Sequence, residues 1–199
     1  MELSDEYLTI ENTPSEGFYS EKRSKFLAFA FHVTSEDEAK NIISEYRKKY
    51  YDARHVCWAY TIGPDYSHSR ANDDGEPSST AGKPILGQIT KNELTDILII
   101  VVRYYGGVNL GTSGLIIAYR TAAAEAIANS NIVRKYQEEE IVYNFAYIMM
   151  NDVMKIVKDL SPRIVEQKYD NTCEIRLAIR KSKASLLKEK LNKLSFRDD

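Results

Sequence analysis

A glycine-rich segment, GGVNLGTSG at residues 106–114, joins an apolar run to an alanine-rich run. Its glycines permit positive φ angles and a close approach of backbone to a ligand, and they are Gly106, Gly107, Gly111 and Gly114. A helix that starts near Gly114, with Thr112 or Ser113 as its cap, would aim backbone N–H groups at an anion. The spacing matches neither a P-loop nor GxGxxG. A phosphate site and a tight strand-to-helix crossing therefore both stay open, and in the first case Asn109 would add a polar side chain.

Arg103, Tyr104 and Tyr105 directly precede this segment. An arginine where a strand meets a glycine-rich loop is well placed to pair with a phosphate or carboxylate, and the tyrosines are available for stacking. The alternative is a structural ion pair between Arg103 and one of the acids at 73–76.

Residues 70–84, RANDDGEPSSTAGKP, form a polar stretch with three acids. Its acids could hold Mg²⁺ with waters, but the spacing is not that of a calcium loop, and a turn at Asp74-Gly75 is the favoured interpretation. The residues expected to structure this loop are Asp73, Asp74, Gly75, Glu76, Thr80 and Gly82. Arg70 and Lys83, at its two ends, are candidate contacts for an anion.

His55 and Cys57 lie two positions apart, on one face of a predicted strand. Such positions rarely give the geometry of a nucleophile–base pair, and zinc needs more ligands than the other two histidines and the distant Cys173 readily supply. A buried structural pair is the favoured interpretation, and no metal site is expected.

Composition limits the class of protein. The 199 residues carry a formal net charge of −2 at pH 7, so bulk attraction to nucleic acid is not indicated and any such binding needs a local patch. Two separated cysteines favour a reduced protein, the N-terminal residues do not resemble a signal peptide, and the aliphatic run 97–102 is far shorter than the roughly 20 residues of a membrane span. We expect a cytoplasmic protein with no membrane association.

The pattern over residues 1–135 predicts an α/β or α+β domain. Strands are expected at 25–33, at 54–62, where Val56, Trp58, Tyr60 and Ile62 share a face, and at 97–105, which is apolar on both faces. Ser35 and Glu38 fit a capping box at the start of an amphipathic helix that continues to Tyr50.

Residues 136–199 predict a second, smaller domain, with the run Glu138–Glu140 at the boundary. A strand is expected at 141–150, a helix at 151–160 capped by Asn151, two strands flanking a turn at Asp170-Asn171, and a closing helix from 182. The order βαββα suggests a ferredoxin-like unit.

A basic segment lies in this second part and includes Arg180, Lys181, Lys183, Lys188 and Lys190. A solvated helix face is its plain interpretation, and a nucleic-acid or ribosome contact is the functional one.

Three ordered motifs, ARHVCWAY (53–60), DDGEPSSTAGKP (73–84) and VVRYYGGVNLGTSGLIIAY (101–119), together resemble the Impact family and its bacterial YigZ-like members. The resemblance covers about residues 15–130. It implies a first domain like the second domain of ribosomal protein S5, and a ferredoxin-like second domain similar to the last domain of elongation factor G. It also implies a link to translation, because eukaryotic members regulate translation by competing for the activator of a kinase.

Three functions follow as hypotheses. The first is a non-catalytic, translation-linked regulator that binds RNA, the ribosome or a translation-regulatory protein in a groove between the 70–84 loop and the glycine-rich segment, with no cofactor. The second is a nucleotide-dependent enzyme, either a hydrolase or similar to the small-molecule kinases that share the S5-like fold, with Mg²⁺ as its cofactor. The third is a protein-interaction module. The oligomeric state is left open.

Overall fold

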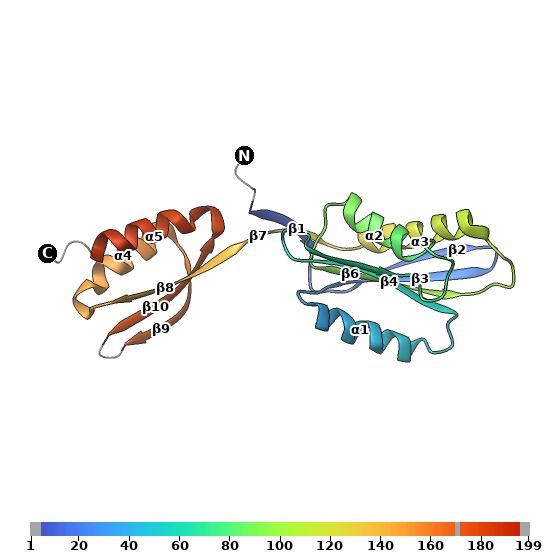
Figure 1. Cartoon of the computed structure of the whole chain (residues 1–199), viewed down its shortest axis with the longest axis horizontal. Coiled ribbons are helices and arrows are strands. Elements are labelled where there is room, and N and C mark those ends of the chain that lie inside the picture. Colours follow the sequence, from blue (N-terminus) through green and yellow to red (C-terminus); the bar gives the residue numbers. More distant parts are fainter. Residues whose placement is uncertain (1–4, 170–171, 196–199) are drawn as a thin grey trace. The chain divides into compact units, whose positions relative to one another are not determined.

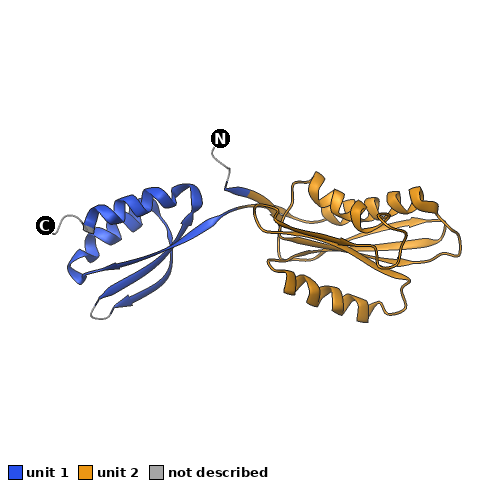
Figure 2. Ribbon diagram, in the orientation of Figure 1, with its two compact units in different colours: residues 1–6, 136–199 blue, residues 7–135 orange. Residues whose placement is uncertain are grey.

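The computed structural model describes residues 5–169 and 172–195. The chain forms two compact units, one of residues 7–135 and a second that joins the segment ending at Glu6 to the residues from Tyr136 onward (Figure 2). The sequence-based boundary at 135/136 coincides with the later of the two divisions, whereas Asp5 and Glu6 lie outside the unit that the sequence assigned to them.

The larger unit contains one main sheet, a two-stranded sheet and three helices (Figure 1). Its elements are, in chain order, β1 (Glu6–Ile10), β2 (Ser15–Glu21), β3 (Ser24–His32), α1 (Glu36–Lys49), β4 (His55–Ile62), β5 (His68–Asn72), α2 (Gly82–Lys91), β6 (Ile97–Tyr104), α3 (Gly111–Ala128) and β7 (Ile132–Tyr136).

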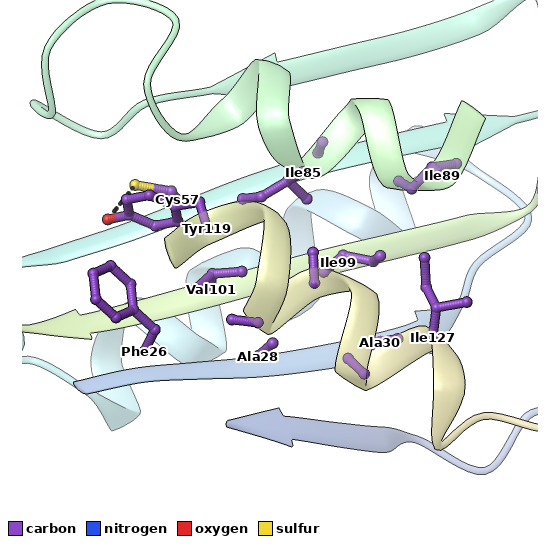
Figure 3. Close-up of a cluster of buried hydrophobic side chains, with 14 of the residues drawn as sticks. Phe26, Ala28, Ala30, Cys57, Ile85, Ile89, Ile99, Val101, Tyr119 and Ile127 are labelled. Atoms are coloured by element: carbon purple, nitrogen blue, oxygen red, sulfur yellow. Dashed lines mark hydrogen bonds between the residues drawn. The ribbon is translucent and has the colours of Figure 1, made fainter. Parts of the chain in front are cut away.

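The main sheet has the order β2-β3-β6-β4-β5, and each neighbouring pair is antiparallel. Helix α1 covers one face, while α2 and α3 cover the other (Figure 1). The central strand β6 is apolar on both faces because each face lies under helices, as the run 97–105 predicts. Alternation in β4 sends Val56, Tyr60 and Ile62 towards α1, whereas Cys57 and Ala59 pack on the opposite side. Figure 3 shows part of the latter core, in which Phe26, Val101 and Tyr119 meet between the sheet and α3.

Several elements of the larger unit differ from the sequence-based expectation. The stretch 70–84 is not all loop, since it begins inside β5 and ends inside α2. Strands β1, β2 and β7 had no predicted counterpart. The capping box is half formed: the Ser35 hydroxyl accepts the Glu38 N–H, but the Glu38 carboxylate accepts the N–H of Thr34 instead of Ser35. The reason is that Thr34 offers both its N–H and its hydroxyl to that carboxylate.

The smaller unit contains β8 (Glu138–Phe145), the 3₁₀ turn η1 (Tyr147–Met149), α4 (Met150–Leu160), β9 (Arg163–Tyr169), β10 (Cys173–Arg180) and α5 (Lys181–Ser195). Its antiparallel sheet has the order β8-β10-β9, and its two helices pack with the inward-facing residues of β8 and β10 around a core of its own.

Two details of this unit correct the expectation. The strand predicted to reach residue 150 ends at Phe145, because a helical turn begins at Tyr147. Helix α4 starts at Met150 without a side-chain cap, so Asn151 lies inside it. The run Glu138–Glu140, expected at the boundary, forms the start of β8, shortly after the division between Lys135 and Tyr136. The predicted turn residues, Asp170 and Asn171, lie outside the described residues. Among the helices that are described, none combines the length and the apolar character that a membrane crossing requires.

Two glycines of the larger unit provide a matched pair for testing how closely its helices pack. A Cβ on Gly17 of β2 would meet the backbone of Ala122 and Ala126 in α3, whereas a Cβ on Gly87 of α2 would meet nothing within 4 Å. We expect Gly17→Ala to lower the free energy of unfolding by about 1–3 kcal/mol through overpacking. Gly87→Ala should raise it by about 0.4–1 kcal/mol, because alanine restricts the unfolded chain and favours a helix. Urea unfolding of both variants measures this, and equal effects would contradict the close packing of β2 on α3.

Candidate functional site

A buried carboxylate, that of Glu76, organises the candidate site. Only 8% of the residue is exposed. Its Oε1 accepts hydrogen bonds from Arg103 Nη1 at 2.5 Å and from the Tyr119 hydroxyl at 2.8 Å, and its Oε2 lies 3.7 Å from His55 Nε2. Arg103 comes from β6, Tyr119 from α3 and His55 from β4. The first and the last lie close together because the antiparallel register places His55 opposite Arg103. One acid of the polar stretch therefore joins the loop to three elements of the larger unit.

In the structure, Arg103 forms an ion pair with Glu76, an acid of the loop. This contact is the structural alternative that the sequence left open for Arg103. The guanidinium carbon also lies 5.6 Å from the ring centres of both Phe26 and Tyr105. Arg103 Nε is buried and has no hydrogen-bond partner among the described residues. Arg103 is thus a buried cation whose structural partner takes only part of its donor capacity.

Asp73 and Asp74 hold the backbone of the loop. The Asp73 carboxylate accepts the N–H groups of Ser79, Ala81 and Gly82 at 2.8–3.0 Å, the last of which opens α2. Asp74 accepts the Val56 N–H at 2.7 Å and pairs with Arg47 of α1.

The rest of this loop is closed by its own turn geometry. Asp74 and Gly75 have positive φ angles of 44° and 84°, and the Thr80 hydroxyl donates to the Pro77 carbonyl at 2.6 Å. Gly82 packs where a Cβ would meet the backbone of Asn72. The acids are therefore occupied as hydrogen-bond acceptors within the protein.

His55 and Cys57 both contact carbonyl groups of this loop. His55 Nδ1 lies 2.7 Å from the Asp74 carbonyl oxygen. Cys57 Sγ lies 3.1 Å from the Asp73 carbonyl oxygen and 3.3 Å from the Tyr119 hydroxyl, and Figure 3 draws the second of these contacts. Burial raises the pKa of the Cys57 thiol and of the Tyr119 phenol, so both remain protonated at neutral pH. No group of three or more His, Cys, Asp and Glu side chains within residues 5–169 and 172–195 could hold a metal ion.

An open cleft of about 650 Å³ lies over Glu76 and Arg103. Tyr105, Asn109, Gly111 and Thr112 also line it, so the structure brings these predicted site residues together with Arg103. His55 and Arg54 line it as well, and the sequence-based site did not include them. Arg54 is the second residue of the ARHVCWAY motif (53–60), but only the pairing of β4 with β6 brings it to the end of the strand that carries Arg103.

Helix α3 begins at the cleft, earlier than expected. Its first residue is Gly111, its N-cap is Leu110, and no side chain caps it, so the expectation of a start near Gly114 with Thr112 or Ser113 as cap is wrong. The physical reason is Gly111 itself, whose positive φ of 72° turns the chain into the helix. Residues 111–113 are exposed and include no acid, and Gly111 and Thr112 line the cleft. The first N–H groups of a helix have no partner within the helix.

Of the other glycines of the segment, Gly106 and Gly114 serve packing, whereas Gly107 serves backbone geometry, since a Cβ there would meet nothing within 4 Å. Gly106 lies against the backbone of Arg23 and Ser24, where a Cβ would clash, and Gly107 has a φ of 84°. Gly114 packs beside the Leu110 side chain within the first turns of α3.

Three of the predicted contacts lie away from this cleft. Arg70 of β5 is near Glu36 of α1, with 3.9 Å between Nε and Oε1. Lys83 lines a separate hollow of about 390 Å³ between α2 and α3, together with Arg120. Tyr104 packs on the α1 side of the sheet, and its hydroxyl donates to Asp52.

The basic segment of the smaller unit is partly occupied by local ion pairs. Arg180 pairs with Asp5 and Glu6, and its guanidinium carbon lies 4.1 Å from the Tyr136 ring centre. Lys188 pairs with Glu139. The remaining predicted members of the patch, Lys181, Lys183 and Lys190, lie at least partly exposed on α5.

The fold and the cleft together define a two-unit, mixed α/β protein with an open cleft at the start of a helix. The sequence matches the family model described as the Impact N-terminal domain over residues 22–127. IMPACT family member YigZ of Escherichia coli (strain K12) is 33% identical over 172 residues, which cover 85% of this chain and 84% of that protein. The chain belongs to the Impact family, as the three sequence motifs predict.

Two further comparisons extend over nearly the whole chain. IMPACT family member YvyE of Bacillus subtilis (strain 168) is 29% identical over 189 residues, covering 95% of this chain and 87% of that protein. A crystal structure described as that of a hypothetical protein superposes with a TM-score of 0.74 at 30% identity, covering 98% of this chain and 96% of that one. Relatives of similar length therefore share both units.

The buried ion pair predicts a non-additive pair of substitutions. Arg103→Met or Glu76→Gln alone leaves a buried group without its partner, and we expect each to lower the free energy of unfolding by about 3–5 kcal/mol. The double variant should lose clearly less than the sum, because neither charge then remains buried. Denaturant unfolding of the four proteins measures the coupling, and strict additivity would contradict a direct interaction.

The Asp73 carboxylate predicts a dependence of stability on pH. Burial raises its pKa, but the three backbone N–H donors outweigh burial, so the pKa in the folded protein lies below the usual value of 3.8. Its contribution is therefore complete above about pH 4 and is lost as the pH falls through the lowered pKa of the folded state. We expect Asp73→Asn to be destabilised at pH 7 and the difference from the native protein to shrink in acid. Thermal melts from pH 7 to pH 2 measure this, and a difference that stays constant would refute the role of the charge.

Proposed function

We propose that this chain is a non-catalytic, translation-linked regulator that binds phosphate groups of RNA, on or off the ribosome, in the cleft between Glu76 and the start of α3. The observation that carries the proposal is one arrangement: the uncapped first turn of α3 and the incompletely paired Arg103 line the same open hollow. A helix N-terminus and a guanidinium are both suited to phosphate oxygens. The translational role comes from the resemblance to the Impact family, and we place it in the cytoplasm.

The charge balance of the cleft supports an anionic ligand. Glu76 is the acid that lines it, and its carboxylate is occupied by Arg103 and Tyr119. Arg54 is exposed and forms no ion pair with any residue that the structure describes. Arg54 and the positive end of α3 are thus left to attract a phosphate.

The same contacts weaken the enzyme hypothesis. Asp73 and Asp74, which would hold Mg²⁺ for nucleotide chemistry, already accept five hydrogen bonds or ion-pair contacts from the loop, β4 and α1. Recruiting them for a metal would dismantle the loop that shapes the cleft. We therefore favour binding without catalysis.

We also propose the finer fold assignments implied by the resemblance. The order β8-α4-β9-β10-α5, with β10 between β8 and β9, supports a ferredoxin-like smaller unit similar to the last domain of elongation factor G. For the larger unit, an antiparallel sheet with α2 and α3 on one face supports an S5 domain 2-like core.

Arg54→Ala tests the proposed function, because Arg54 supports no buried contact. We expect this variant to weaken binding to purified ribosomes and to a ribosomal RNA fragment, and to lower the salt dependence by about 0.7–0.9 in the log–log slope for one lost phosphate contact. The matched control is Lys91→Ala, an exposed cation in the last turn of α2. Co-sedimentation and filter binding at several salt concentrations measure both.

Three results would contradict the proposal. They are no binding by the native protein, equal loss in both variants, or binding that does not respond to salt. Retention of a protein partner by the Arg54→Ala variant, with no RNA binding by the native chain, would favour the protein-interaction module instead.

A further inference from the structure

We infer that the RNA is single-stranded and passes from the cleft over Tyr105 into a second hollow on the opposite face of the sheet. This inference rests on the proposed function and names the class of RNA. The second hollow has a volume of about 530 Å³ and is lined by Phe18, Arg23, Lys25, Leu27, Tyr104 and Tyr105. Its residues come from β2, the β2–β3 turn, β3 and the end of β6.

The pleat of the sheet explains how one path can reach both hollows. Successive side chains of a strand point to opposite faces, so Arg103 faces the α3 side and Tyr104 faces the α1 side, where Lys25 is its partner across the strands. Tyr105 follows the last residue of β6 and lines both hollows. The two hollows therefore meet at this ring, which lies at the end of the sheet.

The second hollow carries uncompensated positive charge. Arg23 and Lys25 are exposed, and neither forms an ion pair with any residue in the described ranges. No acid lines the hollow. The nearby carboxylates have other contacts: Asp52 accepts the Tyr104 hydroxyl, Glu21 accepts the Tyr19 hydroxyl and Glu125 accepts the Phe18 N–H. Together with Arg54 in the cleft, these cations form a track for a phosphate backbone.

The β2–β3 turn adds an independent observation. Glu21 pairs with Ser24, so Lys22 and Arg23 form a two-residue turn, and both have left-handed φ angles of 46° and 67°. Such turns strongly prefer Asn-Gly or similar residues, because a side chain is disfavoured at positive φ. Two long cations here cost local stability and place charge at the edge of the second hollow.

Exposed aromatic rings in the second hollow favour single-stranded RNA over duplex RNA as the ligand. Phe18 is 48% exposed and Tyr105 is 47% exposed, and both line the second hollow. Arg103 contacts the Tyr105 ring, and the Tyr105 hydroxyl donates to Asn109, so this ring is held in place. Stacking on such rings requires unpaired bases, whereas a duplex keeps its bases stacked on one another. A cationic track with aromatic rings is typical of proteins that bind single strands without sequence preference.

The experiment measures fluorescence anisotropy of the full-length protein with a labelled, mixed-sequence single-stranded RNA and with the same RNA as a duplex, at several salt concentrations. One variant, Lys22→Asn with Arg23→Gly, removes two cations and installs the preferred turn residues, so it should fold at least as stably as the native protein. We expect it to weaken single-strand binding and lower the salt slope by at least about 0.7.

A second pair of variants isolates stacking. Tyr105→Leu should weaken single-strand binding about tenfold or more, which is the loss typical of one stacked base, while Tyr105→Phe should retain most of the affinity. The native protein should bind the single strand more tightly than the duplex. Lys91→Ala again controls for a general loss of charge.

The outcomes separate this inference from the proposed function. If Arg54→Ala weakens binding while the turn variant and Tyr105→Leu bind like the native protein, the cleft binds RNA but the path over Tyr105 is wrong. Equal affinity for the duplex also overturns the path. If the native protein binds neither RNA, the proposed function fails together with the inference.

Discussion

The buried carboxylate of Glu76 is the constraint on which the rest of the site depends. A carboxylate removed from water is stable only when charged and hydrogen-bonding partners surround it. Arg103 and Tyr119 meet this requirement, and they fix the loop to β6 and α3. Because Asp73 of the same loop holds the start of α2, the position of that helix also depends on the loop.

In the proposed function, Arg103 serves both structure and ligand recognition. Its ion pair keeps the guanidinium in place, and the guanidinium carbon lies 5.6 Å from the ring centres of both Phe26 and Tyr105. A ligand would therefore meet a preorganised cation instead of ordering a flexible one, which lowers the entropic cost of binding. The exposed Arg54 complements it, since its charge is not neutralised by any partner that the structure describes.

Elements with a strong local pattern could be predicted from the sequence. The apolar run of β6, the alternation in β4 and the periodicity of α1 each match the structure, because burial on one or both faces leaves a direct mark on residue order. Strand β5 and the start of α2 escaped prediction. All of β5 is exposed, and α2 begins in a polar stretch where its N–H groups are satisfied by the distant Asp73. No local pattern records such a contact.

The sequence by itself determined the family, and it predicted β3, β4, β6 and α1 together with five residues that line the cleft, Arg103, Tyr105, Asn109, Gly111 and Thr112. Only the tertiary structure decided which acid pairs with Arg103, that Arg54 and His55 belong to the cleft, and that Arg70 and Lys83 do not. It also brought the β2–β3 turn to Tyr105. The reason is that motifs follow the chain, whereas the cleft forms where antiparallel register aligns strand ends that lie far apart in sequence.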